Sequence, residues 1–256
     1  MQIQQVRHAT LIINYAGIKF LIDPMLAEKD SQPGFEGTAN SHLRNPTVAL
    51  PWPMERILDV DAVIVTHSHP DHWDEAAKAL VPKHLPMFVQ DDADAAMMRS
   101  DGFSDVRLLT TESEFQGISL VKTSGQHGSD QAMEIIGEFL GTVCGVIFRG
   151  AEEKTLYLAG DTLWNEQVQE NLREYTPEVV VLNSGDSQVL GIGSITMSKE
   201  DVYEVHKEAP NAILVATHME AVNHAVLSRA ELREFAIEKG MSDRLFVPED
   251  GEMCVL

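Results

Sequence analysis

Short apolar runs bounded by polar turns recur along the chain and predict an alternation of strands and helices. The runs at 3–6, 10–14 and 18–22, with a turn at Ala16 and Gly17, predict an antiparallel meander at the N-terminus. The later alternation predicts parallel strands within an α/β fold. Strands are expected at 62–65, 87–90, 106–109, 119–122, 155–160, 178–182, 212–217 and 244–247, and helices at 74–80, 91–99, 165–175 and from Lys199 and Arg229.

Two segments depart from this simple alternation. Residues 134–139 and 142–148 are expected to form a β-hairpin that turns at 140–141. The stretch 27–53 is rich in Gly, Pro, Asn, Ser and Thr, and it is too long for an ordinary connection. Long irregular segments of compact domains often carry binding loops, so we expect 27–53 to form one wall of a pocket, as a lid that governs substrate choice. A flexible surface loop is the alternative.

A cluster of metal-binding residue types follows the apolar run 62–65. A buried strand is a stiff anchor, and a short loop leaving it can aim several side chains at one point. Imidazole nitrogen and carboxylate oxygen suit Zn, Fe or Mn, and the lack of cysteine here argues against a purely structural zinc site. A histidine-rich surface turn is the alternative, but the spacing favours a metal site. The cluster consists of His67, His69, Asp71 and His72.

This H-x-H-x-D-H motif after a buried strand resembles the signature of the metallo-β-lactamase superfamily of binuclear metallohydrolases. That family's pattern also asks for an aspartate after an early strand, and then a histidine, an aspartate and a histidine that each follow a strand. All four occur here in order: Asp23, His127, Asp161 and His218. The resemblance spans about the whole chain and implies a four-layer αββα sandwich. With no linker or internal repeat in view, residues 1–256 are expected to form a single domain.

The resemblance implies that seven side chains hold two divalent metal ions, with Zn favoured and Mn or Fe as alternatives. Such ions lower the pKa of bound water from about 15.7 to about 7, which makes a bridging hydroxide available as the nucleophile. Asp71 is the expected catalytic residue, because it can orient this hydroxide or pass its proton to the leaving group. The implied ligands are His67, His69 and His127 for one ion, Asp71, His72 and His218 for the other, and Asp161 between them.

Five further residues are candidates for supporting roles. Asp23 is expected either to orient the ligand loops by hydrogen bonding or simply to form the turn that ends its strand. His224, on the loop that leaves the last ligand, is expected to line the pocket. His8 is interpreted as a structural histidine. His42 and Trp164 have no assigned role.

The charge of the chain restricts its partners. A formal net charge of −21, from 19 basic and 40 acidic residues, with no basic cluster, argues against nucleic acid and anionic membranes as partners. We see no export signal, no apolar run near the roughly 20 residues of a membrane span, and only two cysteines. We therefore expect a cytoplasmic protein that acts on a small molecule, with a homo-oligomer left open.

These constraints rank the reactions that the family supports. The acidic charge disfavours nucleases, the length leaves no room for a fused flavin domain, and true β-lactamases usually carry an export signal. The sequences around His127 and His218 are most similar to the branch that includes ascorbate-6-phosphate lactonases. We therefore expect metal-dependent hydrolysis of a small lactone, ester-like or phosphorylated substrate, with glyoxalase II-type thioesters open. The alternatives are a small-molecule phosphodiesterase and a non-hydrolytic metal-binding or sensing protein.

Overall fold

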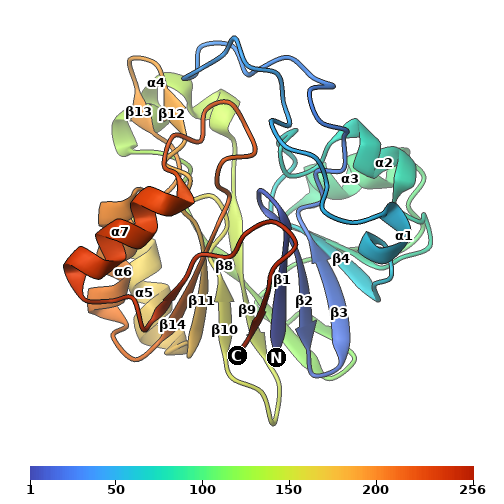
Figure 1. The fold of residues 1–256 in the computed structure, drawn as a ribbon. Helices are drawn as coiled ribbons and strands as arrows, with labels where there is room; N and C mark the ends of the chain where they lie inside the picture. The colour runs from blue at the N-terminus through green and yellow to red at the C-terminus, as the bar shows by residue number, and fades with distance from the viewer.

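Two β-sheets lie face to face at the centre of the molecule, and helices cover both outer faces (Figure 1). The structure is a computed structural model that describes all of residues 1–256. Both termini lie at one end of this sandwich, and the longest loops gather at the other. The architecture confirms the predicted α/β fold with four αββα layers.

The first sheet starts with the predicted antiparallel meander and continues as parallel strands. The parallel part arises because helical connections return the chain in the same direction each time. A C-terminal strand, which was not predicted, pairs antiparallel with β1 at the edge. The order across the sheet is β16 (Met253–Val255), β1 (Gln2–Arg7), β2 (Thr10–Tyr15), β3 (Ile18–Ile22), β4 (Ala62–Val65), β5 (Met87–Val89) and β6 (Val106–Leu108).

The second sheet also has seven strands, and parallel pairs join β10, β11, β14 and β15. Its order is β15 (Leu245–Phe246), β14 (Ile213–Thr217), β11 (Val179–Asn183), β10 (Leu156–Leu158), β9 (Cys144–Arg149), β8 (Ile118–Ser124) and β7 (Glu114–Phe115). A separate small hairpin consists of β12 (Gln188–Val189) and β13 (Gly193–Ser194).

Three apolar layers hold the sheets and helices together. The layer between the sheets includes Phe20 of β3 and Phe148 of β9, whose rings meet edge to face at 5.4 Å. A second layer lies under α1 (Met54–Ile57), α2 (Glu75–Leu80) and α3 (Asp92–Ser100), on the outer face of the first sheet. A third lies under α5 (Glu166–Tyr175), α6 (Lys199–Glu208) and α7 (Arg229–Lys239), on the second sheet. No helix is both long and apolar enough to cross a membrane.

The predicted hairpin at 134–148 is wrong in its first half, which lies in the helix α4 (Asp130–Leu140). Ser129 caps this helix by accepting a hydrogen bond from the Ala132 N–H. Ala132, Met133, Ile136 and Leu140 gather around Ile195, and this spacing suits a helix, because a strand would point Met133 to the opposite face. The β-branched and aromatic residues that suggested a strand are largely solvent-exposed, as the 70% exposure of Phe139 shows.

The long irregular segment 27–53 passes over the end of the sandwich that carries the longest loops, toward α4 and the β12–β13 hairpin (Figure 1). It is fixed there by pairing between Thr38 and Val189 and by a hydrogen bond from the Thr47 N–H to the Ala221 carbonyl. The segment therefore lies on the side to which β1, β3 and β4 direct their carboxyl ends.

Candidate metal centre

The predicted site residues converge at the loop-rich end of the sandwich because each follows the carboxyl end of a strand. These strands belong to both sheets, so residues far apart in the sequence become neighbours. The residues and the strands that they follow are His8 (β1), Asp23 (β3), His67 to His72 (β4), His127 (β8), Asp161 (β10) and His218 (β14).

The donor atoms of these side chains form three overlapping groups. Within each group, all donor atoms lie within 4.8 Å of one another. Every predicted ligand belongs to at least one group, so the structure brings all seven together. The groups are His67, His69 and His127; His8, Asp71, His72 and His218; and His67, His72 and Asp161.

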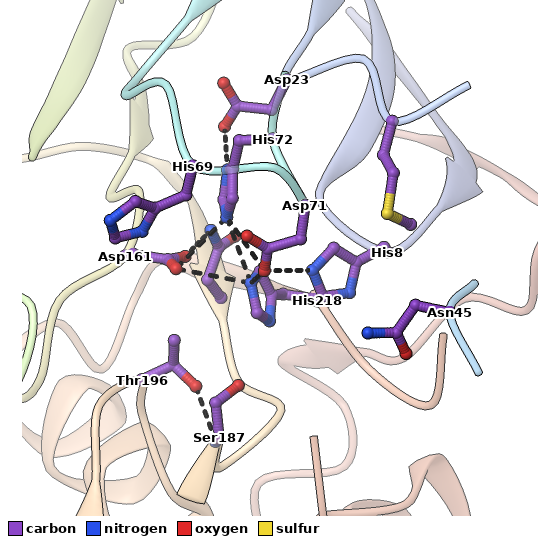
Figure 2. A network of polar contacts seen from close by, with 12 residues as sticks. His8, Asp23, Asn45, His69, Asp71, His72, Asp161, Ser187, Thr196 and His218 are labelled. Atoms are coloured by element: carbon purple, nitrogen blue, oxygen red, sulfur yellow. Dashed lines mark hydrogen bonds and ion pairs between the residues drawn. The ribbon is translucent and has the colours of Figure 1, made fainter. Parts of the chain in front are cut away.

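Asp161 lies between the first two groups. Its Oδ2 atom is 3.2 Å from His72 Nε2, 3.4 Å from His218 Nε2, 3.5 Å from His127 Nε2 and 3.8 Å from His67 Nε2. Figure 2 shows Asp161 and Asp71 on either side of the facing His72 and His218 rings. One carboxylate oxygen is therefore within reach of ring nitrogens from both groups.

Hydrogen bonds on the outside of the cluster decide which ring nitrogens carry hydrogen. His127 Nδ1 lies 2.7 Å from the Ile195 carbonyl, and His69 Nε2 lies 3.1 Å from the Phe139 carbonyl. A carbonyl oxygen only accepts, so these outer nitrogens must donate. The inner nitrogen of each neutral ring then presents a lone pair to the centre of the cluster, as a metal ligand requires.

These lone pairs need a positive charge between them. His69 Nδ1 faces His67 Nε2 at 3.1 Å, and His72 Nε2 faces His218 Nε2 at 3.2 Å. Two facing lone pairs repel each other unless a proton or a cation lies between them. All donor atoms are imidazole nitrogens or carboxylate oxygens, and such a set fits divalent Zn, Mn or Fe.

The ionisation of the cluster also indicates a cation site. Although burial alone would lower the pKa of His218, the Asp161 carboxylate raises it to about 9. Burial would likewise raise the pKa of Asp161, but His218 and His72 lower it well below its usual value. Without metal, the carboxylates thus draw protons onto the rings. A divalent cation between the rings would neutralise the same carboxylate charge.

Asp23 makes the hydrogen bonds expected of a residue that orients the ligand loop. Its carboxylate accepts from the Thr66 N–H and the Thr66 hydroxyl, both at 2.7 Å, and from His72 Nδ1 at 2.9 Å. The last contact turns His72 Nε2 toward the centre of the cluster. Asp23 also follows the end of its strand with a φ of 41°. It therefore has both the hydrogen bonds of an orienting residue and the turn geometry of a strand-ending residue.

His8 is closer to the site than the sequence suggested. Its Nε2 atom lies 3.1 Å from Asp71 Oδ2, and its ring centroid lies 3.7 Å from that of His218. The ring is fully buried, and burial lowers its pKa to about 3. The prediction of a structural histidine missed these contacts. The available signal was its position directly after a strand, which it shares with Asp23 and His218.

Asn183 was missed altogether. Its Nδ2 donates to Asp161 Oδ1 at 2.6 Å, which fixes the outer oxygen of that carboxylate. The available signal was a polar residue at the end of the otherwise apolar strand β11. Asp161 is also positioned by Gly160, whose φ is 70° and whose missing side chain would collide with the Cys144 carbonyl.

An apolar cavity of about 200 Å³ opens onto this centre. Segment 27–53 supplies part of its wall, and His224 lies in the wall with an Nδ1 atom that has no hydrogen-bond partner. His42 is exposed, and Trp164 is partly buried against the apolar layer on the second sheet; neither residue lines the cavity. No lysine or arginine is among the lining residues, which are Phe35, Thr38, His69, Pro70, Asp71, His127, Phe139, Leu140, Val189, Ile195 and His224.

Comparison with known proteins gives a consistent set of relatives. A family model described as a beta-lactamase superfamily domain matches residues 19–219. The UPF0173 protein YddR of Bacillus subtilis is 50% identical over 253 residues, which is 98% of each chain. The crystal structure of an isothiocyanate hydrolase from Delia radicum gut bacteria is 50% identical, with a TM-score of 0.97 over 100% of this chain and 99% of that one. A "possible metal-dependent hydrolase" from Veillonella parvula is 42% identical, with a TM-score of 0.98 and the same coverage.

Proposed function

We propose that this chain, which belongs to the metallo-β-lactamase superfamily, is a metal-dependent hydrolase of small, uncharged, apolar electrophiles. Two features support the proposal: a buried cluster of imidazoles and carboxylates that fits divalent cations, and an apolar cavity that opens onto it. The similarity to a crystal structure described as a possible metal-dependent hydrolase agrees with the reaction class.

We assign two metal ions to the cluster, with Zn favoured over Mn or Fe. When bound, such ions supply an activated water molecule and polarise the bond under attack. The position of Asp161 between the two groups of rings supports a bridging role. The proposed ligands are His67, His69 and His127 for one ion and Asp71, His72 and His218 for the other.

Asp71 is the residue that we propose carries a proton during turnover. Burial alone would raise its pKa, but His72 and His218 lower it well below the usual value, so its carboxylate is ionised in the resting site. It lines the apolar cavity, and His8 lies 3.1 Å from its Oδ2 atom on the far side. A fixed, ionised carboxylate beside the substrate can accept a proton from water and return it to the leaving group.

The residues that line the cavity support an uncharged, apolar substrate. Phe35, Phe139, Leu140, Val189 and Ile195 form an apolar wall, and no cationic side chain is present to bind a phosphate. Phosphate recognition normally uses lysine, arginine or a helix N-terminus. Of the substrates expected from the sequence, an uncharged lactone or ester therefore suits this cavity better than a phosphorylated one.

Isothiocyanates are the uncharged electrophiles that we favour, because the related crystal structure from Delia radicum gut bacteria is that of an isothiocyanate hydrolase. In this reaction water adds to the central carbon of R–N=C=S, the carbon–nitrogen bond breaks, and the products are the amine R–NH2 and carbonyl sulfide. The nitrogen gains two protons that come from the water, and Asp71 is placed to transfer one of them. The R group would occupy the apolar cavity.

The test is turnover of a substrate panel by protein loaded separately with Zn, Mn or Fe. The panel contains allyl and 2-phenylethyl isothiocyanate, a δ-lactone, 4-nitrophenyl acetate, 4-nitrophenyl phosphate and bis(4-nitrophenyl) phosphate. We expect the isothiocyanates to be turned over best and the phosphates not at all. Preferred cleavage of the phosphodiester would contradict the proposal. Tight metal binding without turnover of any substrate would instead favour a metal-binding or sensing protein.

A further inference from the structure

One wall of the apolar cavity is held by a buried asparagine. Asn223 is 2% exposed, and its side-chain amide makes four hydrogen bonds. Its Nδ2 donates to Thr38 Oγ1 at 2.8 Å and to the Ala39 carbonyl at 2.6 Å. Its Oδ1 accepts from the Phe35 N–H at 3.0 Å and from Asn45 Nδ2 at 2.9 Å. A side-chain amide offers two donors and two acceptor lone pairs, so every hydrogen-bonding group of this amide has a partner.

The backbone of Asn223 makes two further hydrogen bonds to segment 27–53. Its N–H donates to Asn45 Oδ1 at 2.8 Å, and its carbonyl accepts from Asn40 Nδ2 at 3.2 Å. Asn45 is also 2% exposed, so these two asparagines hold each other in an environment from which water is excluded. Hydrogen bonds in such an environment are stronger than in water, and losing one partner leaves the other unsatisfied.

Two residues that Asn223 contacts, Phe35 and Thr38, line the cavity. Phe35 packs edge-on against His224, with ring centroids 5.1 Å apart and an interplanar angle of 89°. Thr38 Oγ1 also donates to the Phe35 carbonyl at 2.6 Å. Asn223 belongs to the loop that leaves the proposed ligand His218, so one loop connects the cavity wall with the metal centre.

We propose that Asn223 is a positioning residue that fixes Phe35 and Thr38 as the cavity wall and thereby sets the size of the apolar group that a substrate can carry. The proposal rests on the proposed function, since it concerns the substrate of the same site. Segment 27–53 forms no helix or long strand that could fix this wall by a regular backbone ladder. Apart from the short backbone pairing around Thr38 and the bond from the Thr47 N–H, its position depends on side-chain hydrogen bonds, and four of these converge on one amide.

The first test compares Asn223→Ala with the matched variant Thr47→Val. Thr47 Oγ1 donates to the Glu220 carbonyl at 2.6 Å and so ties the same segment to the same loop, but Thr47 lies outside the cavity lining. Hydrogen exchange of residues 35–40 is measured in the metal-free proteins. We expect faster exchange in Asn223→Ala and an unchanged rate in Thr47→Val.

The second measurement is selectivity, expressed as the ratio of kcat/KM for 2-phenylethyl and allyl isothiocyanate. We expect Asn223→Ala to shift this ratio toward the larger substrate by on the order of 10-fold, with metal content unchanged, because differences of this size follow from small changes in apolar pockets. Thr47→Val should leave the ratio unchanged. A merely structural role of Asn223 would lower both kcat/KM values equally, and that result would overturn the proposal.

A double-mutant cycle shows whether Asn223 acts through the cavity wall. In a Phe35→Ala background the wall is already shortened, so Asn223→Ala should shift the ratio little further. An additional shift of the full size would contradict the proposal. If Asn223→Ala does not fold, Asn45→Ala takes its place. It removes the hydrogen bond from Asn45 Nδ2 to Asn223 Oδ1 and the one from the Asn223 N–H to Asn45 Oδ1, and it should change exchange and selectivity in the same direction.

Failure of this proposal differs from failure of the proposed function. If the unmodified protein turns over no isothiocyanate, the proposed substrate is wrong, and the ratio is measured with 4-nitrophenyl acetate and a longer-chain 4-nitrophenyl ester. If the unmodified protein is active but Asn223→Ala and Asn45→Ala leave exchange and selectivity unchanged, the positioning role of Asn223 is wrong.

Discussion

Three residues at the site adopt backbone conformations that are uncommon for residues other than glycine. His8, Asp23 and His218 have positive φ values of 57°, 41° and 64°, in the left-handed region that side chains other than glycine disfavour. Each such residue costs on the order of 1 kcal/mol and is typically found where geometry at a site requires it. All three follow strand ends; the His8 and His218 side chains belong to the cluster, and the Asp23 carboxylate contacts His72.

The H-x-H-x-D-H motif identified His67, His69, Asp71 and His72, because their spacing is local and visible. The resemblance to the family pattern added the other three proposed ligands, His127, Asp161 and His218. His8 and Asn183 could not be placed in the same way. Their roles depend on contacts with Asp71 and Asp161 that exist only once the strands of each sheet have assembled, since β1 and β4 share the first sheet and β10 and β11 share the second. A single histidine or asparagine after a strand has many ordinary explanations.

Asp71→Asn should lower turnover by about 10²–10⁴-fold, because it removes a positioned proton acceptor. Binding of one metal ion should survive, since His67, His69 and His127 form a separate group of donors. Steady-state kinetics and metal analysis of the same preparation test this prediction. Near-normal turnover at full metal content would show that Asp71 does not transfer the proton.

Asp23→Asn should weaken metal binding by about 10–100-fold, the usual effect of losing a partner that orients a ligand. The variant removes the charge that holds His72 Nδ1 and turns its Nε2 inward. Competition with a chromogenic chelator measures the affinity. The matched control is Asp59→Asn, which neutralises an aspartate with a 75% exposed side chain. Equal metal affinity in both variants would contradict the positioning role of Asp23.

At the level of elements, most strands and helices that pack in the core were predicted, whereas α1, α4, β7, β12, β13 and β16 were not. Strands β7, β12 and β13 have two residues each, too few to show any periodicity. In α4, the composition favoured a strand, but the Ser129 cap and the packing of Ala132, Met133, Ile136 and Leu140 on one face stabilise a helix. This helix carries cavity residues at its C-terminal end and begins just after His127.

Phe139→Ala should change substrate selection without changing metal content. The Phe139 ring lines the cavity, whereas His69 is held by the Phe139 backbone carbonyl, which the substitution keeps. We therefore expect an altered KM for the larger substrates. Ile135→Ala, on the same helix and 59% exposed, is the matched control and should have no effect. Loss of metal from Phe139→Ala would show that the ring itself is needed to hold His69.

At the level of the whole molecule, the balance of protons and metal ions links the site to stability. His218 has a folded-state pKa of about 9, raised from an ordinary value of 6.5. A raised pKa stabilises the fold fully below pH 6.5, and this contribution is lost as pH rises toward 9. His8 and His224, with pKa values of about 3 and 4, stay neutral throughout this window.

Metal-free protein should therefore lose stability between pH 6.5 and 9, while protein saturated with Zn should lose much less. The metal ion replaces the protons and is not released by a rise in pH over this range. Urea unfolding with EDTA or with excess Zn, at several pH values, measures the difference. Identical pH dependence in both conditions would contradict the exchange of protons for metal at the cluster.

We propose that the cluster holds two metal ions, one in each of two groups of donors. The most direct test is anomalous diffraction at the Zn edge from crystals of the Zn-loaded protein, with elemental analysis of the same sample. We predict two fully occupied ions per chain, one beside His67, His69 and His127 and the other beside Asp71, His72 and His218, with Asp161 between them. A single ion per chain at saturating Zn, or ions bound away from these residues, would contradict the account.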